Sequence, residues 1–188
     1  MSSNDSITVA KAELRRHIRL LKSETASSRE AESEAVTAIV KNLPAWRNAR
    51  TILLYSSIEG ELDTTSLLST EGKDFILPVV EGNTLTLRRY NPIHLKKGYK
   101  GIMEPTEDAP TVSAKVIELA LIPGVAFDRN CHRMGRGKGF YDRLLPDLSC
   151  PVIGLALSCQ LVDEVPVEEH DVQLSGIAHP DGFIEMSV

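Results

Sequence analysis

The stretch VIELALIPGVAF, residues 116–127, indicates the fold because its apolar residues run on with little interruption. A strand with one solvent-facing side alternates apolar and polar residues, whereas a continuous run is typical of a strand buried on both faces of a parallel sheet. Similar runs occur elsewhere in the chain, at TILLYSS (51–57), DFILPVV (74–80) and PVIGLAL (151–157). The segment TLTLRRY (84–90) alternates instead, which predicts a strand with one wet face.

Helical patterns precede and separate these strands. Residues 8–24 have the apolar spacing of a helix face, and a second helix is expected between a capping box at Ser27 and Glu30 and a stop at Pro44. Shorter helices are expected in two places: DTTSLLST (63–70) and FYDRLLPDL (140–148). Residues 91–113, rich in Pro, Gly, Lys and Glu, predict a long loop of the kind that is often functional. Strands alternating with helices define a layered α/β fold.

The composition bounds the class of protein. With 188 residues, 42% hydrophobic and 25% charged, the chain is expected to form one globular domain spanning residues 1–188. It has no apolar run of roughly 20 residues that could span a bilayer, and its first residues lack a signal-peptide core. Three cysteines without a Cys-x-x-Cys pair fit free thiols in a reducing compartment. We therefore expect a cytoplasmic protein without a membrane partner.

The charge balance argues against nucleic acid as a partner, but one segment departs from it. The net charge is −5 and the isoelectric point about 5.6, whereas a nucleic-acid binder normally shows a broad basic face. In HRMGRGKGFYDRLL (132–145), glycines alternate with cations: Arg133, Gly135, Arg136, Gly137, Lys138 and Gly139. Glycine lets a backbone approach a ligand closely, and the cations favour an anion. The alternative is a solvated basic turn.

The position of this segment favours phosphate as the anion. It is expected to follow the strand 116–127 and to open a helix, which is where open α/β sheets bind ligands. Its spacing matches neither G-x-G-x-x-G nor the Walker A motif, so it predicts only a general polyphosphate loop. Asp142, in the first turn of that helix, either complements the helix dipole or is a ligand of Mg²⁺, which takes one or two carboxylates plus phosphate oxygens.

The stretch LIPGVAFDRNCHRMGRGKGFYDRLL (121–145) resembles the signature of the 5-formyltetrahydrofolate cyclo-ligase family. That signature has an apolar strand, Pro-Gly and Phe-Asp before Arg-Leu-Gly-x-Gly-x-Gly-Tyr-Tyr-Asp; here Met134 replaces the Leu and Phe140 the first Tyr. Weaker similarities follow the family order at KAELRRHIR (11–19), SSIEGELDT (56–64), GIMEP (101–105) and PVEEHDVQLSGI (166–177).

The resemblance implies a three-layer α/β/α fold with a mostly parallel sheet and helices on both faces. It also implies an ATP- and Mg²⁺-dependent ligase that converts 5-formyltetrahydrofolate to 5,10-methenyltetrahydrofolate, ADP and phosphate through an iminium phosphate. Such chemistry needs positioning and charge neutralisation rather than a protein nucleophile. We expect a monomer whose partners are these small molecules. The alternative is a non-catalytic homologue that binds folate or nucleotide on the same fold.

Carried over residue by residue, the resemblance implies that ATP is bound by two residues of the first helix and by the glycine-rich segment: Lys11, Arg15, Arg133, Met134, Gly135, Arg136, Gly137, Lys138, Gly139, Phe140 and Tyr141. Lys11 and Arg15 lie one helical turn apart and share a face, which without the resemblance is simply a solvated face. Arg136 and Lys138 are expected to act in catalysis by holding the transferring phosphoryl group.

For the folate, the resemblance implies contacts from Ser56, Glu61, Phe140 and Tyr141. Glu61 would accept hydrogen bonds from pterin N–H groups, although acids are also favoured in the first turn of a helix. The two aromatic residues either line the pterin or pack the helix into the core, and Glu104 either lines the folate end or anchors its loop.

The metal and two substitutions complete the comparison with the family pattern. Asp142 and Asp171 match the magnesium-associated acids of the family. Ser175 stands where many relatives carry an acid, and Val79 stands after Pro78 where Arg is common. We expect these departures to alter folate contacts or metal affinity rather than the phosphate loop.

Overall fold

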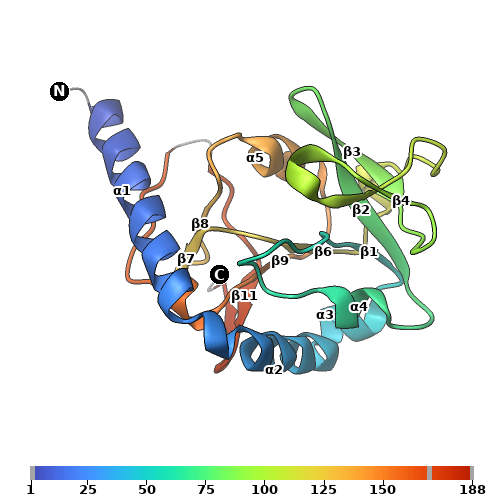
Figure 1. Cartoon of the computed structure of the whole chain (residues 1–188), viewed down its shortest axis with the longest axis horizontal. Coiled ribbons are helices and arrows are strands. Elements are labelled where there is room, and N and C mark those ends of the chain that lie inside the picture. The colour runs from blue at the N-terminus through green and yellow to red at the C-terminus, as the bar shows by residue number, and fades with distance from the viewer. Residues whose placement is uncertain (1–2, 169–170, 187–188) are drawn as a thin grey trace.

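A computed structural model describes residues 3–168 and 171–186. Its centre is a seven-stranded mixed sheet formed by β1 (Thr51–Leu53), β2 (Asp74–Glu81), β3 (Thr84–Arg89), β6 (Leu119–Ile122), β9 (Val152–Leu155), β11 (Gly176–His179) and β12 (Gly182–Glu185). The strand order is β12–β11–β9–β6–β1–β2–β3 (Figure 1). The strands from β11 to β2 are parallel, and only the outermost pairs β11–β12 and β2–β3 are antiparallel. The mostly parallel α/β sheet is thereby confirmed.

Helices lie on both faces of this sheet: α2 (Arg29–Asn42), α3 (Pro44–Asn48), α4 (Thr65–Leu68) and α5 (Phe140–Leu144). The first helix, α1 (Ser3–Glu24), packs instead against a separate, smaller sheet. Short 3₁₀ turns lie in the connections between elements: η1 (Ala26–Ser28), η2 (Tyr99–Gly101), η3 (Ala114–Val116), η4 (Leu145–Asp147) and η5 (Ser158–Gln160). One core cluster packs the sheet against α2, α3 and α4, and a second packs the other face against α5 and η4. Figure 1 shows α2 and α5 on opposite sides of the strands.

The central strands explain why their sequences are continuously apolar. In β1, Ile52 belongs to the cluster under α2, while its neighbour Leu53 belongs to the cluster under α5. In β6, Leu121 and Ile122 divide in the same way, and all four side chains are fully buried. Because successive strand residues point to opposite faces, a sheet covered on both sides needs an apolar residue at every position.

The predicted single strand over 116–127 is wrong, because the chain leaves the main sheet at Pro123 and Gly124. β7 (Ala126–Asp128) instead pairs with β8 (Arg133–Met134) and β10 (Leu161–Val162) in a separate three-stranded sheet. Proline has no N–H to donate to a ladder, and a Cβ on Gly124 would collide with the ring of Phe127. The bend therefore forms inside an uninterrupted apolar run.

Other element boundaries also differ from expectation. Residues 91–113 are not one loop, since β4 (Leu95–Lys97) and β5 (Met103–Pro105) form an antiparallel hairpin there. The capping box at Ser27 does not form: α2 begins at Arg29, and the Ser28 hydroxyl donates to the Glu32 carboxylate at 2.7 Å. Pro44 ends α2 as expected and also begins α3.

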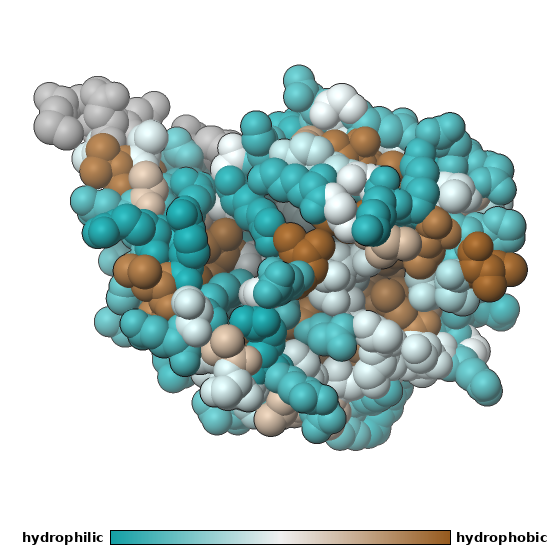
Figure 2. All heavy atoms as spheres, viewed as in Figure 1, coloured by the Kyte–Doolittle hydropathy of each residue, from teal (hydrophilic) through white to brown (hydrophobic). Residues whose placement is uncertain are grey.

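The surface seen in Figure 2 is largely hydrophilic, with hydrophobic residues in small separate groups. Within residues 3–168 and 171–186, no helix has both the length and the apolarity that crossing a membrane requires.

Candidate active site

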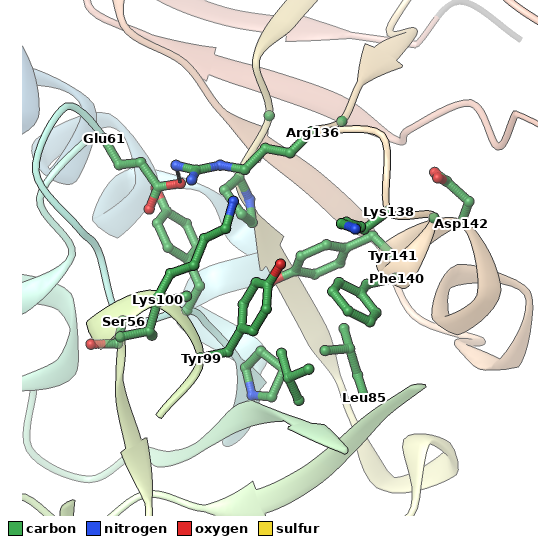
Figure 3. A pocket seen from close by; sticks show the side chains of 18 of the residues that line it. Ser56, Glu61, Leu85, Tyr99, Lys100, Arg136, Lys138, Phe140, Tyr141 and Asp142 are labelled. Carbon is green, nitrogen blue, oxygen red and sulfur yellow. Dashed lines mark hydrogen bonds and ion pairs between the residues drawn. The ribbon is translucent and has the colours of Figure 1, made fainter. Parts of the chain in front are cut away.

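A cavity of about 170 Å³ lies where the segments that follow β1 and β6 meet the glycine loop, a name used here for residues 133–139. Its other walls come from α5, the β2–β3 hairpin and the turn at η2 (Figure 3). The carboxyl ends of parallel strands are the usual ligand-binding edge of such sheets. The cavity is therefore the candidate active site.

Most residues predicted for the site line this cavity: Ser56, Glu61, Arg133, Gly135, Arg136, Lys138, Gly139, Phe140, Tyr141 and Asp142. Five described residues of the prediction lie outside the lining: Lys11, Arg15, Met134, Gly137 and Asp171. The side chain of Met134 is buried in a small cluster with Ile18, where it packs the glycine loop against α1.

The glycine loop owes its shape to two left-handed residues. Gly137 has φ +87° and Gly139 has φ +66°, which other residues rarely adopt. A Cβ on Gly139 would lie 2.6 Å from an Nη atom of Arg143, and one on Gly135 would lie 3.0 Å from an Nη atom of Arg133. At Gly137 the nearest protein atom would be 3.5 Å away, so there the left-handed φ rather than lack of space favours glycine.

Arg133 is the buried cation of the site. Its side chain is 4% exposed, and its Nη2 donates to Asp142 Oδ1 at 2.5 Å. The guanidinium also lies 5.5 Å from the ring centroid of Tyr141. Its Nε–H has no acceptor among the described residues. A buried donor without a partner is costly, so this N–H is suited to an oxygen atom of a ligand.

Arg136 joins the predicted nucleotide and folate regions. Its Nη2 donates to Glu61 Oε1 at 2.6 Å, which links the glycine loop to the segment between β1 and α4. The Glu61 side chain is largely buried and the Arg136 side chain half-exposed. Figure 3 shows the pair at one rim of the cavity, with Lys138 on the other side of the opening.

The predicted residues of α1 contact the glycine loop and the C-terminal segment. Arg15 donates from Nε to the carbonyl oxygen of Gly135 at 3.0 Å. Lys11 Nζ lies 2.7 Å from carboxylate oxygens of both Glu168 and Asp171. Partial burial works to lower the pKa of Lys11, but hydrogen bonds and charge from these two acids outweigh it and raise that pKa above 10.5. α1 thus holds two segments that are distant in sequence.

The carboxylates around the cavity can hold Mg²⁺ only together with a ligand. Among the described residues, no three His, Cys, Asp or Glu side chains are grouped closely enough to form a metal site alone. Asp142 uses Oδ1 for Arg133, and no described residue hydrogen-bonds its Oδ2. One free carboxylate oxygen beside the cationic glycine loop suits Mg²⁺, which takes one or two carboxylates and completes its shell with ligand oxygens and water.

Aromatic side chains form the apolar wall of the cavity. Phe140 and Tyr141 both line it, and Tyr141 also packs against the core cluster under α5, as the packing alternative predicted for that residue. Burial raises the pKa of Tyr141 far above 10, with the Glu61 charge adding to the effect. Burial likewise raises the pKa of Tyr55, which is also in the lining. The Tyr55 hydroxyl donates a hydrogen bond to the Leu62 carbonyl oxygen at 3.3 Å.

Glu104 both lines the cavity and anchors its loop, so neither alternative excludes the other. Its side chain is buried and accepts hydrogen bonds from the backbone N–H groups of Val80 and Tyr99. Burial raises its pKa above 4.5 in spite of these bonds. Tyr99 in turn meets the ring of Phe140 edge-on, with centroids 6.2 Å apart.

Several lining residues were missed by sequence reasoning: Pro78, Val80, Leu85, Tyr99, Lys100 and Ile102. The only signal was the prediction that residues 91–113 form a functional loop. The two departures from the family pattern lie away from the lining: Val79 is buried in β2, and Ser175 Oγ accepts from the N–H of Val152 at 3.0 Å.

An α/β sheet with a cationic glycine loop and an aromatic cavity at its carboxyl edge defines a ligand-binding enzyme fold. The model of the 5-formyltetrahydrofolate cyclo-ligase family matches residues 7–180. The 5-formyltetrahydrofolate cyclo-ligase of Haemophilus influenzae is 34% identical over 182 residues, which cover 90% of this chain and 97% of that protein. The Escherichia coli K12 protein of the same name is 36% identical over 143 residues, covering 70% and 79%.

A solved structure agrees with these sequence comparisons. The NMR structure of Aquifex aeolicus 5,10-methenyltetrahydrofolate synthetase matches with a TM-score of 0.84 and 33% identity, covering 95% of this chain and 93% of that one. The chain therefore belongs to the 5-formyltetrahydrofolate cyclo-ligase family and is a ligase, as the resemblance in the sequence implied.

Proposed function

We propose that this enzyme uses Mg²⁺ and ATP to convert 5-formyltetrahydrofolate to 5,10-methenyltetrahydrofolate, with release of ADP and phosphate. Beyond family membership, one observation carries the proposal. Arg133 borders the cavity with a buried Nε–H that has no acceptor among the described residues. An unsatisfied cationic donor beside a glycine-rich loop favours a phosphate oxygen as its partner.

The glycine loop and α1 are proposed to bind the nucleotide. Lys138 and Arg136 would hold the transferring phosphoryl group, since phosphoryl transfer depends mainly on positioning and on neutralising charge. Arg15, through its bond to the Gly135 carbonyl, would keep the loop in place while its remaining N–H groups face the phosphates. Lys11 would contribute charge from the same face of α1. Because the Met134 side chain is buried in the core, only its backbone is offered to ATP.

The chemistry proceeds in two steps. The formyl oxygen on N5 of the folate attacks the γ-phosphorus of ATP, and ADP leaves as the bond to its bridging oxygen breaks. N10 then attacks the activated formyl carbon and loses its proton. The bond between this carbon and the former formyl oxygen breaks, and inorganic phosphate leaves with that oxygen as one of its four. Ring closure is intramolecular, so the protein needs only to hold the two nitrogens in a near-attack arrangement and exclude water. No protein nucleophile is required.

The apolar wall is proposed to receive the pterin. Phe140 and Tyr141 supply ring contacts. Glu61, whose carboxylate is largely shielded from solvent, accepts hydrogen bonds from pterin N–H groups. Ser56 also lines the cavity and is the remaining candidate for a folate contact.

Asp142 is proposed as a ligand of Mg²⁺ through its free Oδ2. Asp171 is the second candidate, although it lies outside the cavity lining and its Oδ2 is paired with Lys11. When bound, the metal neutralises charge on the phosphate oxygens.

The test is turnover of 5-formyltetrahydrofolate with ATP and Mg²⁺, followed by the near-ultraviolet absorbance of the methenyl product and by release of ADP. We expect product and ADP in equal amounts. Thermal stabilisation by folate or ATP without any ADP, at enzyme concentrations comparable to substrate, would instead identify a non-catalytic binding protein.

A further inference from the structure

The cations that border the cavity differ in their partners. Arg133 is paired with Asp142, and Arg136 with Glu61. Lys138 and Lys100 have no carboxylate partner among residues 3–168 and 171–186, and the proposed function employs only Lys138. Lys100 thus lines the cavity without a role in the proposed reaction and without an ion-pair partner among the described residues.

The backbone at Lys100 is held in an unusual conformation. Its φ of 54° and ψ of 26° lie in the left-handed region, which a lysine rarely adopts. Gly98 and Gly101 flank it, and a Cβ on Gly98 would collide with the buried carboxylate of Glu104. That carboxylate accepts the N–H of Tyr99, so the turn is fixed from beneath. Backbone held in a rare conformation by its surroundings is characteristic of ligand-binding positions.

The side chain of Lys100 is presented at the rim of the cavity. Its Nζ lies 5.5 Å from the ring centroid of Tyr99, which itself contacts Phe140. Figure 3 shows Lys100 reaching from the turn toward the rim where Glu61 and Arg136 lie. The residue is exposed, so its ammonium is accessible to a ligand that projects from the cavity.

The size of the cavity indicates which part of the substrate projects. A volume of about 170 Å³ is below the roughly 300–1,000 Å³ of pockets that enclose a whole drug-sized ligand. The bicyclic ring of a folate fills such a space, and its benzoyl-glutamate end must extend over the rim. The carboxylates of that end are the only formal anions of a folate.

We propose that Lys100 binds a carboxylate of the glutamate end of the substrate and so makes the enzyme select folates that keep this end. This inference rests on the proposed function, because it assumes that the pterin occupies the apolar wall. Lys100 acts here as a specificity-determining residue and takes no part in phosphoryl transfer.

The test combines a protein change with a substrate change. Steady-state constants are measured with 5-formyltetrahydrofolate and with the uncharged amide of 5-formyltetrahydropteroate, which has neither the glutamate nor a benzoate carboxylate. Both are measured for the wild type and for Lys100→Met, which keeps an unbranched side chain without the charge. We expect Lys100→Met to raise KM for the folate about three- to tenfold and to leave KM for the pteroate amide and for ATP unchanged. Lys100→Arg retains most of the affinity, and Lys97→Ala, an exposed lysine of the same hairpin, changes neither constant.

Three results would overturn the proposal: an equal rise for both folate substrates, a rise in KM for ATP, or no change. Dissociation constants of the same ligands, measured by calorimetry, apply the test without turnover. Absence of turnover by the wild type would refute the proposed function. If the wild type turns over both substrates and Lys100→Met does not change their KM values differently, only this inference is refuted.

Discussion

At the scale of single residues, the two arginines of the cavity are each paired with a carboxylate. Arg133 is buried against Asp142, while the more exposed Arg136 reaches across the cavity rim to Glu61. Exposed ion pairs contribute little to stability, whereas buried charges depend strongly on their partners. Substitutions in the buried pair are therefore expected to lower stability as well as activity, whereas substitutions of exposed cations should lower mainly activity.

Replacing Lys138 or Arg136 with alanine should impair turnover far more than folding. Both side chains are proposed to face the transferring phosphoryl group, so kcat should fall about 100-fold or more. For Lys138→Ala we expect Tm to stay within about 2 °C, whereas Arg136→Ala should lower Tm somewhat more, because it leaves the largely buried Glu61 carboxylate without its partner. Lys115→Ala, which removes an exposed lysine outside the cavity lining, is the matched control. Parallel losses of Tm and activity in calorimetry and steady-state assays would make the loop structural.

Asp142→Asn should affect both properties. The change removes the charge that balances the buried Arg133 guanidinium, and we expect a loss of about 1–2 kcal/mol in the free energy of unfolding. If Oδ2 ligates Mg²⁺, the concentration of metal needed for half-maximal activity also rises. Urea unfolding and a metal titration measure the two effects separately, and an unchanged titration would remove the metal role from Asp142.

Glu104 should make the free energy of unfolding fall as the pH rises, whereas an acid whose pKa is lowered by a salt bridge makes it rise. Its pKa is raised above 4.5, so the folded state holds the proton more tightly than the unfolded state. The stabilising contribution is complete below about pH 4.5 and is lost as the pH rises through the folded pKa. Glu104→Gln cannot ionise and should gain stability relative to the wild type from pH 4.5 to neutrality. Urea denaturation at several pH values measures the difference, and a difference independent of pH would contradict the prediction.

At the scale of elements, α1 supports the glycine loop through a side-chain hydrogen bond from Arg15 and the apolar contact of Ile18. Arg15→Ala should therefore raise KM for ATP about tenfold and leave Tm almost unchanged, since Ile18 still packs against Met134. Arg19→Ala, an exposed arginine on the same helix, is the control. Equal KM values for the two variants in an ATP titration would show that Arg15 does not support nucleotide binding.

The sequence predicted the elements whose pattern depends on burial, and it failed where tertiary contacts decide. The central strands were found because a sheet covered on both faces requires continuous apolar residues. The bend at Pro123 was missed because apolar residues continue on both sides of it, and only the ring of Phe127 shows why Gly124 is needed. The hairpin within 91–113 was missed because its short strands carry exposed lysines.

The candidate site was predicted to a similar extent. The glycine loop and Glu61 carry recognisable local patterns, and the fold brings them to one cavity. Leu85, Tyr99 and Lys100 have no distinctive spacing, and they reach the cavity only because β3 and the η2 turn fold over it. Which acids pair with which cations also depends on the fold, as the Lys11–Asp171 contact illustrates.

At the scale of the whole molecule, the described lining of the cavity comes from segments spread over residues 55–142 of one chain. We expect catalysis by a single chain, so the turnover number should not change when the enzyme is diluted from micromolar to nanomolar concentration. Activity measured across such a dilution series, with carrier protein to prevent adsorption, tests this. A turnover number that falls with dilution would indicate that a second copy completes the site.

The strand order has a consequence for biosynthesis. β1, β2 and β3 leave the ribosome first and lie side by side, and β6, β9, β11 and β12 then join one after another at the same open edge. No later strand has to insert between two that are already paired, so a nascent chain can assemble its sheet in the order of translation. The β3 edge stays in place throughout, and at every intermediate length the opposite edge is the one that the next strand to emerge will cover.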